Sequence, residues 1–283
     1  MARRATDLHR KVRDVLGHTV PLIAEADRPI VHYESSANAG QVLLQYLGNH
    51  IDGKAVYEGH FGHLRRMVLA ELIESFEQFL KALAAVCIDF LAPYTADDRL
   101  DGFVPNRGDK IAAFVNAPSL GKALCEPDTW LTNATINKRF ASLLKAPSGA
   151  DWESLFPQAN QTPVAERPRA ATLALLWQVR HNLAHNVGVL TRSDAMKLRV
   201  LSGGAVLEGG RLSPSADDIR YVKRFLDESA DATNRRIGAR LADILTGFHA
   251  ADPGLFDAQV GADAIARKFA IPVTVNGRVG TPD

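Results

Sequence analysis

The strongest hydrophobic pattern in the chain lies between residues 60 and 93. Apolar side chains recur there every three or four residues, which is the spacing that places them on one face of an α-helix. The apolar positions are Leu64, Met67, Val68, Leu72, Phe76, Phe79, Leu80, Leu83 and Val86. Pro93 is expected to stop this helix, because proline lacks the backbone N–H that a helix interior requires. The pattern predicts a helix long enough to run the length of a domain.

Two other long stretches show the same periodicity. One begins at about Pro168, since the first turn of a helix accepts proline, and the other opens at residues 215–218 and runs to about Phe248. The apolar stripe of the first comprises Ala170, Leu173, Leu176, Trp177, Leu183 and Val187, and that of the second includes Ile219, Leu226, Ile237, Leu241 and Leu245. Both helices are therefore expected to pack in a core.

Weaker signals predict short helices around the three long ones. They are expected at residues 5–16, 38–48, 133–145, 194–201 and 254–270. Ser193 is expected to cap the helix at 194–201, because a serine hydroxyl can accept a bond from the first free backbone N–H groups. Pro21 and Pro29 are expected to break the chain before the helix at 38–48.

Little of the sequence indicates β-structure. A short strand is expected at residues 111–115, and two Gly-Gly pairs suit a small hairpin within residues 202–213. Residues 147–167 are rich in Pro, Gly, Asn and Gln, and we interpret them as a connection inside the domain. Its apolar residues Trp152, Leu155 and Phe156 are expected to anchor it to the core, and the chain from Pro272 is expected to be extended or loose.

These elements predict an all-α protein, a helical bundle with extra N-terminal helices and at most a small β-hairpin. We expect residues 1–58 to form an N-terminal helical extension, residues 59–270 the helical domain and residues 271–283 a tail. We find no internal repeat that would divide the domain further.

Composition narrows the function classes only a little. The 283 residues are 46% hydrophobic and 23% charged, as in ordinary globular proteins, and the net charge is +1. A nucleic-acid partner would therefore need a local basic face. Two segments offer one, the basic stretch at residues 5–16 and the cluster Arg235, Arg236 and Arg240. Each could contact RNA phosphates or simply face solvent.

The location is expected to be cytoplasmic. The basic N-terminus has no apolar run behind it, so it does not resemble a secretory signal. No stretch of ~18 uncharged apolar residues predicts a membrane span. The two cysteines, Cys87 and Cys125, suit a reducing compartment better than a disulfide framework.

A dense polar cluster interrupts the apolar helix that starts near Pro168. It reads Arg180-His181-Asn182-Leu183-Ala184-His185-Asn186. Such side chains beside buried positions are costly to remove from water unless they are paired or have a function. Histidine transfers protons near neutral pH, and arginine binds phosphate through a planar fork. These are the two groups that metal-free cleavage of RNA by its own 2′-hydroxyl requires.

The spacing of Arg180 and His185 raises a geometric difficulty. Five residues on a helix correspond to about 140° of rotation, so one copy does not aim both groups at one point. A two-fold dimer would relieve this, because it brings the same surface together twice.

Two other readings of the cluster remain open. His181 and His185 are four residues apart, as metal ligands on a helix often are, but Asn182 stands where a HExxH zinc protease has its glutamate and no third ligand is evident. We therefore predict no metal and no cofactor. The cluster could also be structural and bond the ends of helices.

The segment from Arg180 to Asn186, with Gly188 shortly after, resembles the signature of the HEPN superfamily, which has Arg, a polar residue and then His. The layout of residues 60–248 is similar too, with acidic residues in the first long helix (FEQFL, residues 76–80) and a glycine-rich connector after the motif. Asn or Asp is commoner at the position that His181 holds. The resemblance implies an α-helical homodimer and, in many members, a metal-independent ribonuclease.

The resemblance also implies roles for individual residues. Arg180 and His185 would be the catalytic pair with Asn182, or His181 in its place, as the third polar residue. Asn186 would support them, and one glutamate of the first long helix, Glu74, is expected to face the site. The predicted function is an endoribonuclease of a toxin–antitoxin or anti-phage system, whose partners are RNA, a second copy and a cognate antitoxin or regulatory protein. The alternatives are a non-catalytic HEPN-like module that binds RNA, nucleotide or protein, and a metal hydrolase using the two histidines.

Overall fold

The computed structural model describes residues 28–51, 58–94, 99–100, 103, 117, 119–126, 130–145, 155–156, 167–202, 204 and 210–282. The predicted helix at 5–16, the predicted strand at 111–115 and the predicted anchor Trp152 lie outside these residues. The helices are α2 (Pro29–Ile51), α3 (Glu58–Leu91), α5 (Leu120–Cys125), α6 (Asn133–Leu143), α7 (Arg167–Asn186), α8 (Arg192–Ser202), α9 (Ala216–Ala251) and α10 (Ala258–Phe269). Two short strands, β1 (Val273–Val275) and β2 (Arg278–Gly280), follow.

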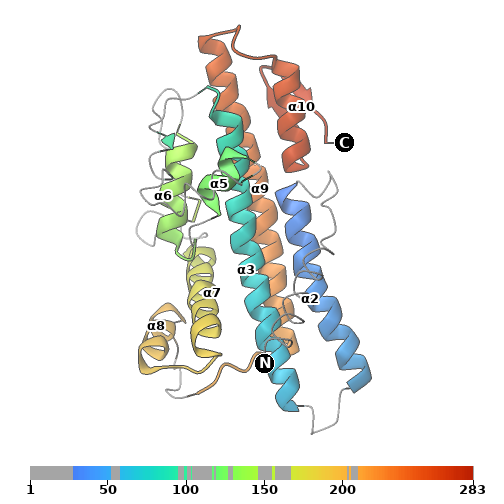
Figure 1. The fold of residues 1–283 in the computed structure, drawn as a ribbon, viewed down its shortest axis with the longest axis vertical. Helices are drawn as coiled ribbons and strands as arrows, with labels where there is room; N and C mark the ends of the chain where they lie inside the picture. The colour runs from blue at the N-terminus through green and yellow to red at the C-terminus, as the bar shows by residue number, and fades with distance from the viewer. Residues whose placement is uncertain are drawn as a thin grey trace, which may run out of the picture.

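The prediction of an all-α fold with a small hairpin is confirmed. Helices α2, α3 and α9 lie side by side as three long rods, and α7 packs against α3 (Figure 1). The predicted helix at 60–93 corresponds to α3, and that at 215–248 to α9, which starts with a reciprocal capping box between Ser215 and Asp218. No helix in the described part of the chain is both long enough and apolar enough to span a membrane.

The core is centred on α3. Phe76 is fully buried and its ring lies 6.1 Å from that of Tyr33 on α2 and 6.0 Å from that of Trp177 on α7. The ring of Phe156, which lies in the connection before α7, is 6.5 Å from the Phe76 ring. Leu155 and Phe156 are buried, which confirms their predicted role as anchors. One aromatic ring therefore joins α2, α3, α7 and a loop, and it fixes the position of α7.

Helix α2 is longer than the predicted helix at 38–48. Pro29 begins it instead of breaking the chain, because a proline in the first turn gives up an N–H that would have no helical partner there. Ile30, Tyr33 and Ala37 are buried in the common core. The described part of the expected N-terminal extension therefore belongs to the same bundle.

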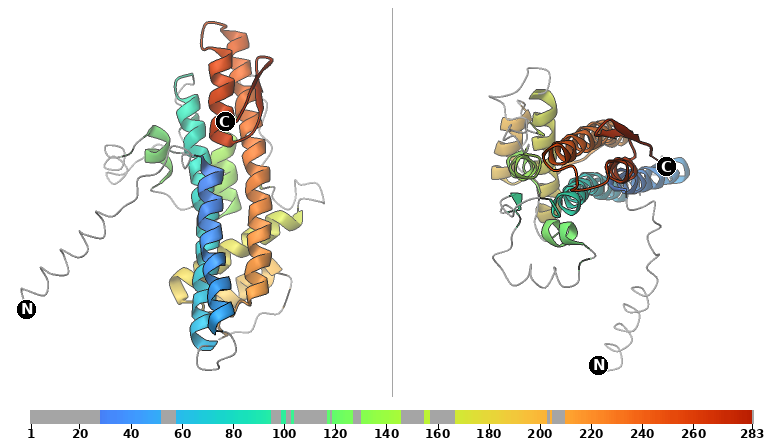
Figure 2. Two further views of the ribbon diagram at one scale, coloured as in Figure 1. Left: turned by 90° about the vertical axis from the view of Figure 1, so that its right-hand side faces the viewer. Right: turned by 90° about the horizontal axis from the view of Figure 1, so that it is seen from above.

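The C-terminal chain, expected to be extended or loose, is extended and ordered. β1 and β2 form an antiparallel hairpin in which Val275 pairs with Arg278, packed on α9 and α10 (Figure 2). Asn276 and Gly277 make its two-residue turn with φ of 50° and 76°, the left-handed region that an Asn-Gly pair adopts most easily. The Asn-Gly pair between two valine-containing runs was the missed signal.

Most of the small hairpin or strand-turn expected at residues 202–213 lies outside the described residues. Residues 210–212 pair with the turn after α7, through Leu190 N to Gly210 O at 2.8 Å and Leu212 N to Gly188 O at 2.8 Å. This pairing ties the segment just before α9 to the turn that follows α7.

Candidate functional site

The polar cluster forms the C-terminal part of α7, which packs against α3. Leu173, Leu176 and Trp177 are buried as their spacing predicts, and the Trp177 indole donates to Asn133 Oδ1 at 3.0 Å. Val187 is exposed rather than part of the stripe, because α7 ends at Asn186 and Val187 has a φ of 51°. The last turns of α7 thus lie where the core meets solvent.

Arg180 is held at this boundary by a buried carboxylate. Its guanidinium Nη2 lies 3.9 Å from Glu77 Oε2, with 19% of the Arg180 side chain exposed against 2% for Glu77. Glu77 also accepts a bond from the backbone N–H of Trp130 at 2.9 Å and lies 3.3 Å from Lys81 Nζ. A separation of 3.9 Å is longer than a hydrogen bond, so Glu77 attracts Arg180 without occupying its N–H donors.

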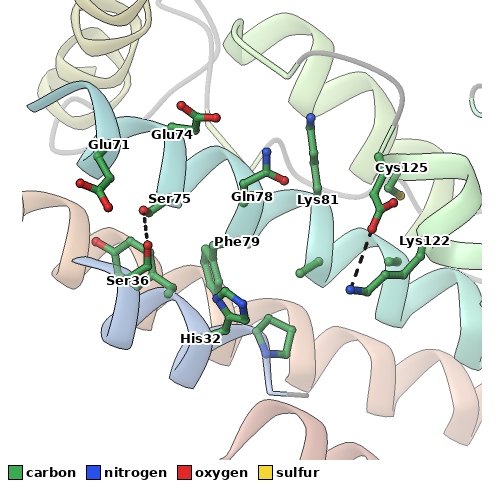
Figure 3. Close-up of a pocket in the computed structure, with 15 residues that line it drawn as sticks. His32, Ser36, Glu71, Glu74, Ser75, Gln78, Phe79, Lys81, Lys122 and Cys125 are labelled. Carbon is green, nitrogen blue, oxygen red and sulfur yellow. Dashed lines mark hydrogen bonds and ion pairs between the residues drawn. The ribbon is translucent and has the colours of Figure 1, made fainter. Parts of the chain in front are cut away.

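The glutamate that faces Arg180 is Glu77 and not Glu74. Glu74 is exposed and lines a groove of about 370 Å³ between α2, α3 and α5 (Figure 3). Glu77 lies four residues after Ile73 and seven before Ala84, both fully buried, so it sits on the buried face of α3. An acidic residue at a buried helical position was the signal that could have identified it.

His181 and His185 form the exposed part of the cluster. Their rings are one helical turn apart, with centroids separated by 4.6 Å. The structure therefore brings the two imidazoles together, while Arg180 turns toward α3. In the described residues no group of three or more His, Cys, Asp or Glu side chains is arranged to hold a metal ion.

Asn182 has a structural position that differs from its predicted catalytic role. It is fully buried, and its amide donates to Val189 O at 2.8 Å and to Asp194 Oδ2 at 3.3 Å. From there it cannot touch a substrate, so it acts by holding the turn after α7. The Asn186 amide donates to the same Asp194 oxygen at 2.9 Å, and its expected support of the catalytic pair stays a prediction.

Asp194 is the residue that sequence reasoning missed. Its side chain is buried and accepts bonds from Thr191 Oγ1 at 2.7 Å and Gln178 Nε2 at 3.2 Å, in addition to the two asparagines. These donors lower the pKa of the Asp194 carboxyl, the Thr191 hydroxyl most and Asn182 next, and the nearby charge of His181 acts in the same direction, against the effect of burial. One carboxylate therefore joins α7, the turn and α8.

Thr191, rather than Ser193, caps helix α8. Asp194 N donates to Thr191 Oγ1 at 3.2 Å, and Thr191 N donates back to the Asp194 carboxylate at 3.4 Å. This is the reciprocal bonding of a capping box, which the sequence T-x-x-D could have indicated. The prediction of Ser193 as the cap is wrong by two positions, because α8 begins at Arg192.

The turn after α7 packs directly on α3. Gly188 has a φ of +81°, and a Cβ atom there would lie 2.8 Å from Cδ of Arg66. Arg66 Nη1 donates to the carbonyl of Leu212 at 3.3 Å. The end of the motif helix is thus closed by a glycine turn, an arginine of α3 and the segment at 210–212.

The predicted RNA-binding cluster on α9 lies away from the polar cluster at the end of α7. Arg240 Nε donates to Leu144 O at the C-terminal end of α6, whereas Asn133 at the other end of α6 bonds to Ala170 on α7. The 11 residues of α6 span about 16 Å, so Arg240 is well separated from the motif. Arg235 is paired with Asp231 at 3.0 Å, and Arg236 is half-buried on the same helix.

Comparisons of the chain with protein-family models, with curated proteins and with solved structures gave no match.

Proposed function

We propose that this protein is a metal-independent endoribonuclease of HEPN type, acting as a homodimer in the cytoplasm in a toxin–antitoxin or anti-phage system. The observation that carries the proposal is the end of α7, where two exposed imidazoles lie 4.6 Å apart beside a guanidinium that a buried carboxylate holds in place. Proton transfer and anion stabilisation are what RNA cleavage without a metal needs.

In the proposed reaction His185 accepts the proton of a 2′-hydroxyl as its oxygen attacks the adjacent phosphorus. The bond from phosphorus to the 5′-oxygen breaks, and that oxygen takes a proton from a second imidazole. The products are a 2′,3′-cyclic phosphate and a 5′-hydroxyl. Arg180 stabilises the charge on the pentacoordinate phosphorus through N–H donors that its 3.9 Å pairing with Glu77 leaves available.

The second imidazole would be His181 of the same copy, whose ring centroid lies 4.6 Å from that of His185. The proposed dimer would bring Arg180 of one copy toward His185 of the other. Exposed apolar side chains around this end of the molecule support such an interface, since contiguous exposed apolar groups commonly mark contact surfaces. They are Met67, Val187, Val189, Met196 and Val200.

The first test is incubation of the purified protein with total RNA in the presence of EDTA. We expect cleavage that survives the chelator, products with 2′,3′-cyclic phosphate ends, and loss of cleavage in His185→Ala. His32→Ala is the matched control, because His32 is also an exposed histidine but lies on α2. Binding of RNA without any cleavage would favour a non-catalytic module instead. Cleavage that EDTA abolishes, with 5′-phosphate ends, would favour a metal hydrolase.

The second test asks whether the site is shared between copies. Arg180→Ala and His185→Ala are each expected to be inactive, with Arg180→Ala losing several kcal/mol of transition-state stabilisation. When the two variants are mixed and allowed to exchange subunits, half of the dimers pair one of each, and one of their two sites regains both side chains. Activity should then return to about a quarter of the wild-type rate. No recovery after confirmed exchange would contradict a shared site.

A further inference from the structure

Arg66 is a buried arginine that has no counter-charge in the described structure. Only 9% of the residue is exposed, and its Nε is covered and has no hydrogen-bond partner. Its one recorded bond goes to a neutral group, the carbonyl of Leu212. Among the described residues, no ion pair joins Arg66 to a carboxylate. A charge in this state is costly, because it has lost water without gaining an opposite charge.

A second positive charge, that of Arg211, acts on Arg66. The pKa of Arg66 is lowered, first by burial and then by the positive charge of Arg211. Arg211 is exposed and stands next to Leu212, the residue whose carbonyl Arg66 binds. Its backbone is fixed by the bridge to Val189. The titratable neighbours of Arg66 on α3, His63 and Arg65, carry no negative charge. Among the residues that the structure describes, neither of these two neighbouring guanidiniums is paired with an acidic side chain.

The pair lies directly beside the proposed catalytic helix. Arg66 packs against Gly188, three residues after His185, and Arg211 is bridged to Val189 in the same turn. From Arg180 to Asn186, the last residue of α7, is about 9 Å along the helix, and Gly188 follows two residues later. This length corresponds to a few phosphates of a stacked strand at about 3.4 Å each.

We propose that Arg66 and Arg211 form a phosphate-binding subsite that holds the RNA backbone to one side of the cleaved bond. A phosphodiester supplies the missing negative charge, and its oxygens match the planar fork of a guanidinium. Arg211, being exposed, makes the first contact, and Arg66 adds a fixed charge beneath it. This inference rests on the proposed ribonuclease function, since it identifies how that site would hold its substrate.

The test uses a short 2′-O-methyl RNA, which lacks the attacking hydroxyl and so reports binding alone. Its affinity is measured by fluorescence anisotropy between about 50 and 200 mM salt for wild type, Arg211→Ala and the control Arg224→Ala. Arg224 is an exposed arginine on α9 that stacks over Tyr221. We expect Arg211→Ala to lower the slope of log K against log salt by about 0.7 and to bind about fivefold more weakly at 0.1 M salt, with Arg224→Ala unchanged.

A second measurement follows thermal unfolding with and without inorganic phosphate. The unfolding temperature of the wild type should rise with phosphate, and that of Arg211→Ala and Arg66→Met should rise less. If Arg66→Met does not fold, the Arg211→Ala variant alone tests the subsite.

A slope of log K against log salt for Arg211→Ala equal to that of the wild type overturns the subsite. A phosphate effect lost in Arg211→Ala with unchanged RNA binding overturns the RNA backbone as its ligand. The expected slope change in a protein that does not cleave RNA supports the subsite and refutes the ribonuclease.

Discussion

Replacing Asp194 by Asn tests how much the junction of α7 and α8 depends on one carboxylate. Asn has the same shape but no charge, and one of its two terminal atoms is a donor. Its oxygen can still accept from Thr191 and Asn186, which lie 2.7 and 2.9 Å from Asp194 Oδ2. Its NH₂ group then faces the Gln178 amide, which donates to Oδ1 in the native protein, so that bond is lost.

The expected cost follows from the bonds that change. A hydrogen bond to a charged group contributes about 1.5–3 kcal/mol and a neutral one about 0.5–1.5 kcal/mol. At the lower ends of these ranges the two shortest bonds lose about 1 kcal/mol each on becoming neutral and the bond from Gln178 loses about 1.5 kcal/mol, which together is about 3.5 kcal/mol. Because the carboxylate lies near the surface of the bundle, we reduce this to about 2 kcal/mol for solvent screening. That corresponds to a fall of about 4–8 °C in the unfolding temperature.

The pH dependence provides an internal check on the cause. The folded-state pKa of Asp194 is lowered from its ordinary value of 3.8, so its carboxylate stabilises the fold above that value. The contribution is lost as the pH falls through the lowered, folded-state pKa. The difference in unfolding free energy between wild type and Asp194→Asn should therefore be constant from neutral pH down to about 4 and should shrink below it.

The measurement is urea unfolding followed by circular dichroism at several pH values. The control is Asp231→Asn, which removes an exposed carboxylate paired with Arg235 and should change stability by less than about 0.5 kcal/mol. An Asp194→Asn protein as stable as the wild type at pH 7, or a difference that persists unchanged at pH 2–3, would refute the role assigned to this carboxylate.

Other substitutions test the packing around the site. Glu77→Gln should destabilise the fold by about 3 kcal/mol in urea unfolding, because the buried Lys81 loses its partner at 3.3 Å, and it should also reduce any RNA cleavage as Arg180 loses its anchor. Gly121→Ala should destabilise the fold by about 3 kcal/mol and clearly lower the unfolding temperature, because its Cβ would overlap the carbonyl oxygen of Ala85; an unchanged temperature would mean that α5 is free to shift. Tyr33→Phe should cost only about 1 kcal/mol, measured in the same way, because Asp227 loses the 3.0 Å bond from the phenol but keeps Lys223.

The sequence by itself determined the helical class and the three long helices with core-facing stripes, α3, α7 and α9. A helix places residues three or four positions apart on one face, so its buried stripe is visible in the order of the residues alone. Local signals also define the Ser215 capping box, the Asn276-Gly277 turn and the Thr191-x-x-Asp194 cap. The motif from Arg180 to Asn186, on which the proposed HEPN assignment mainly rests, is likewise local in the chain.

Only the tertiary structure decided which side chains of the polar cluster meet. Glu77 rather than Glu74 faces Arg180, because the rotation of α3 against α7 is set by core packing around Phe76. Asn182 is buried because the start of α8 places Asp194 against it, and the Asn182 amide donates to that carboxylate. Arg66 met Arg211 because residues 210–212 pair with the turn at 188–190. These contacts join residues up to 146 positions apart, and no local pattern encodes the angles at which their helices cross.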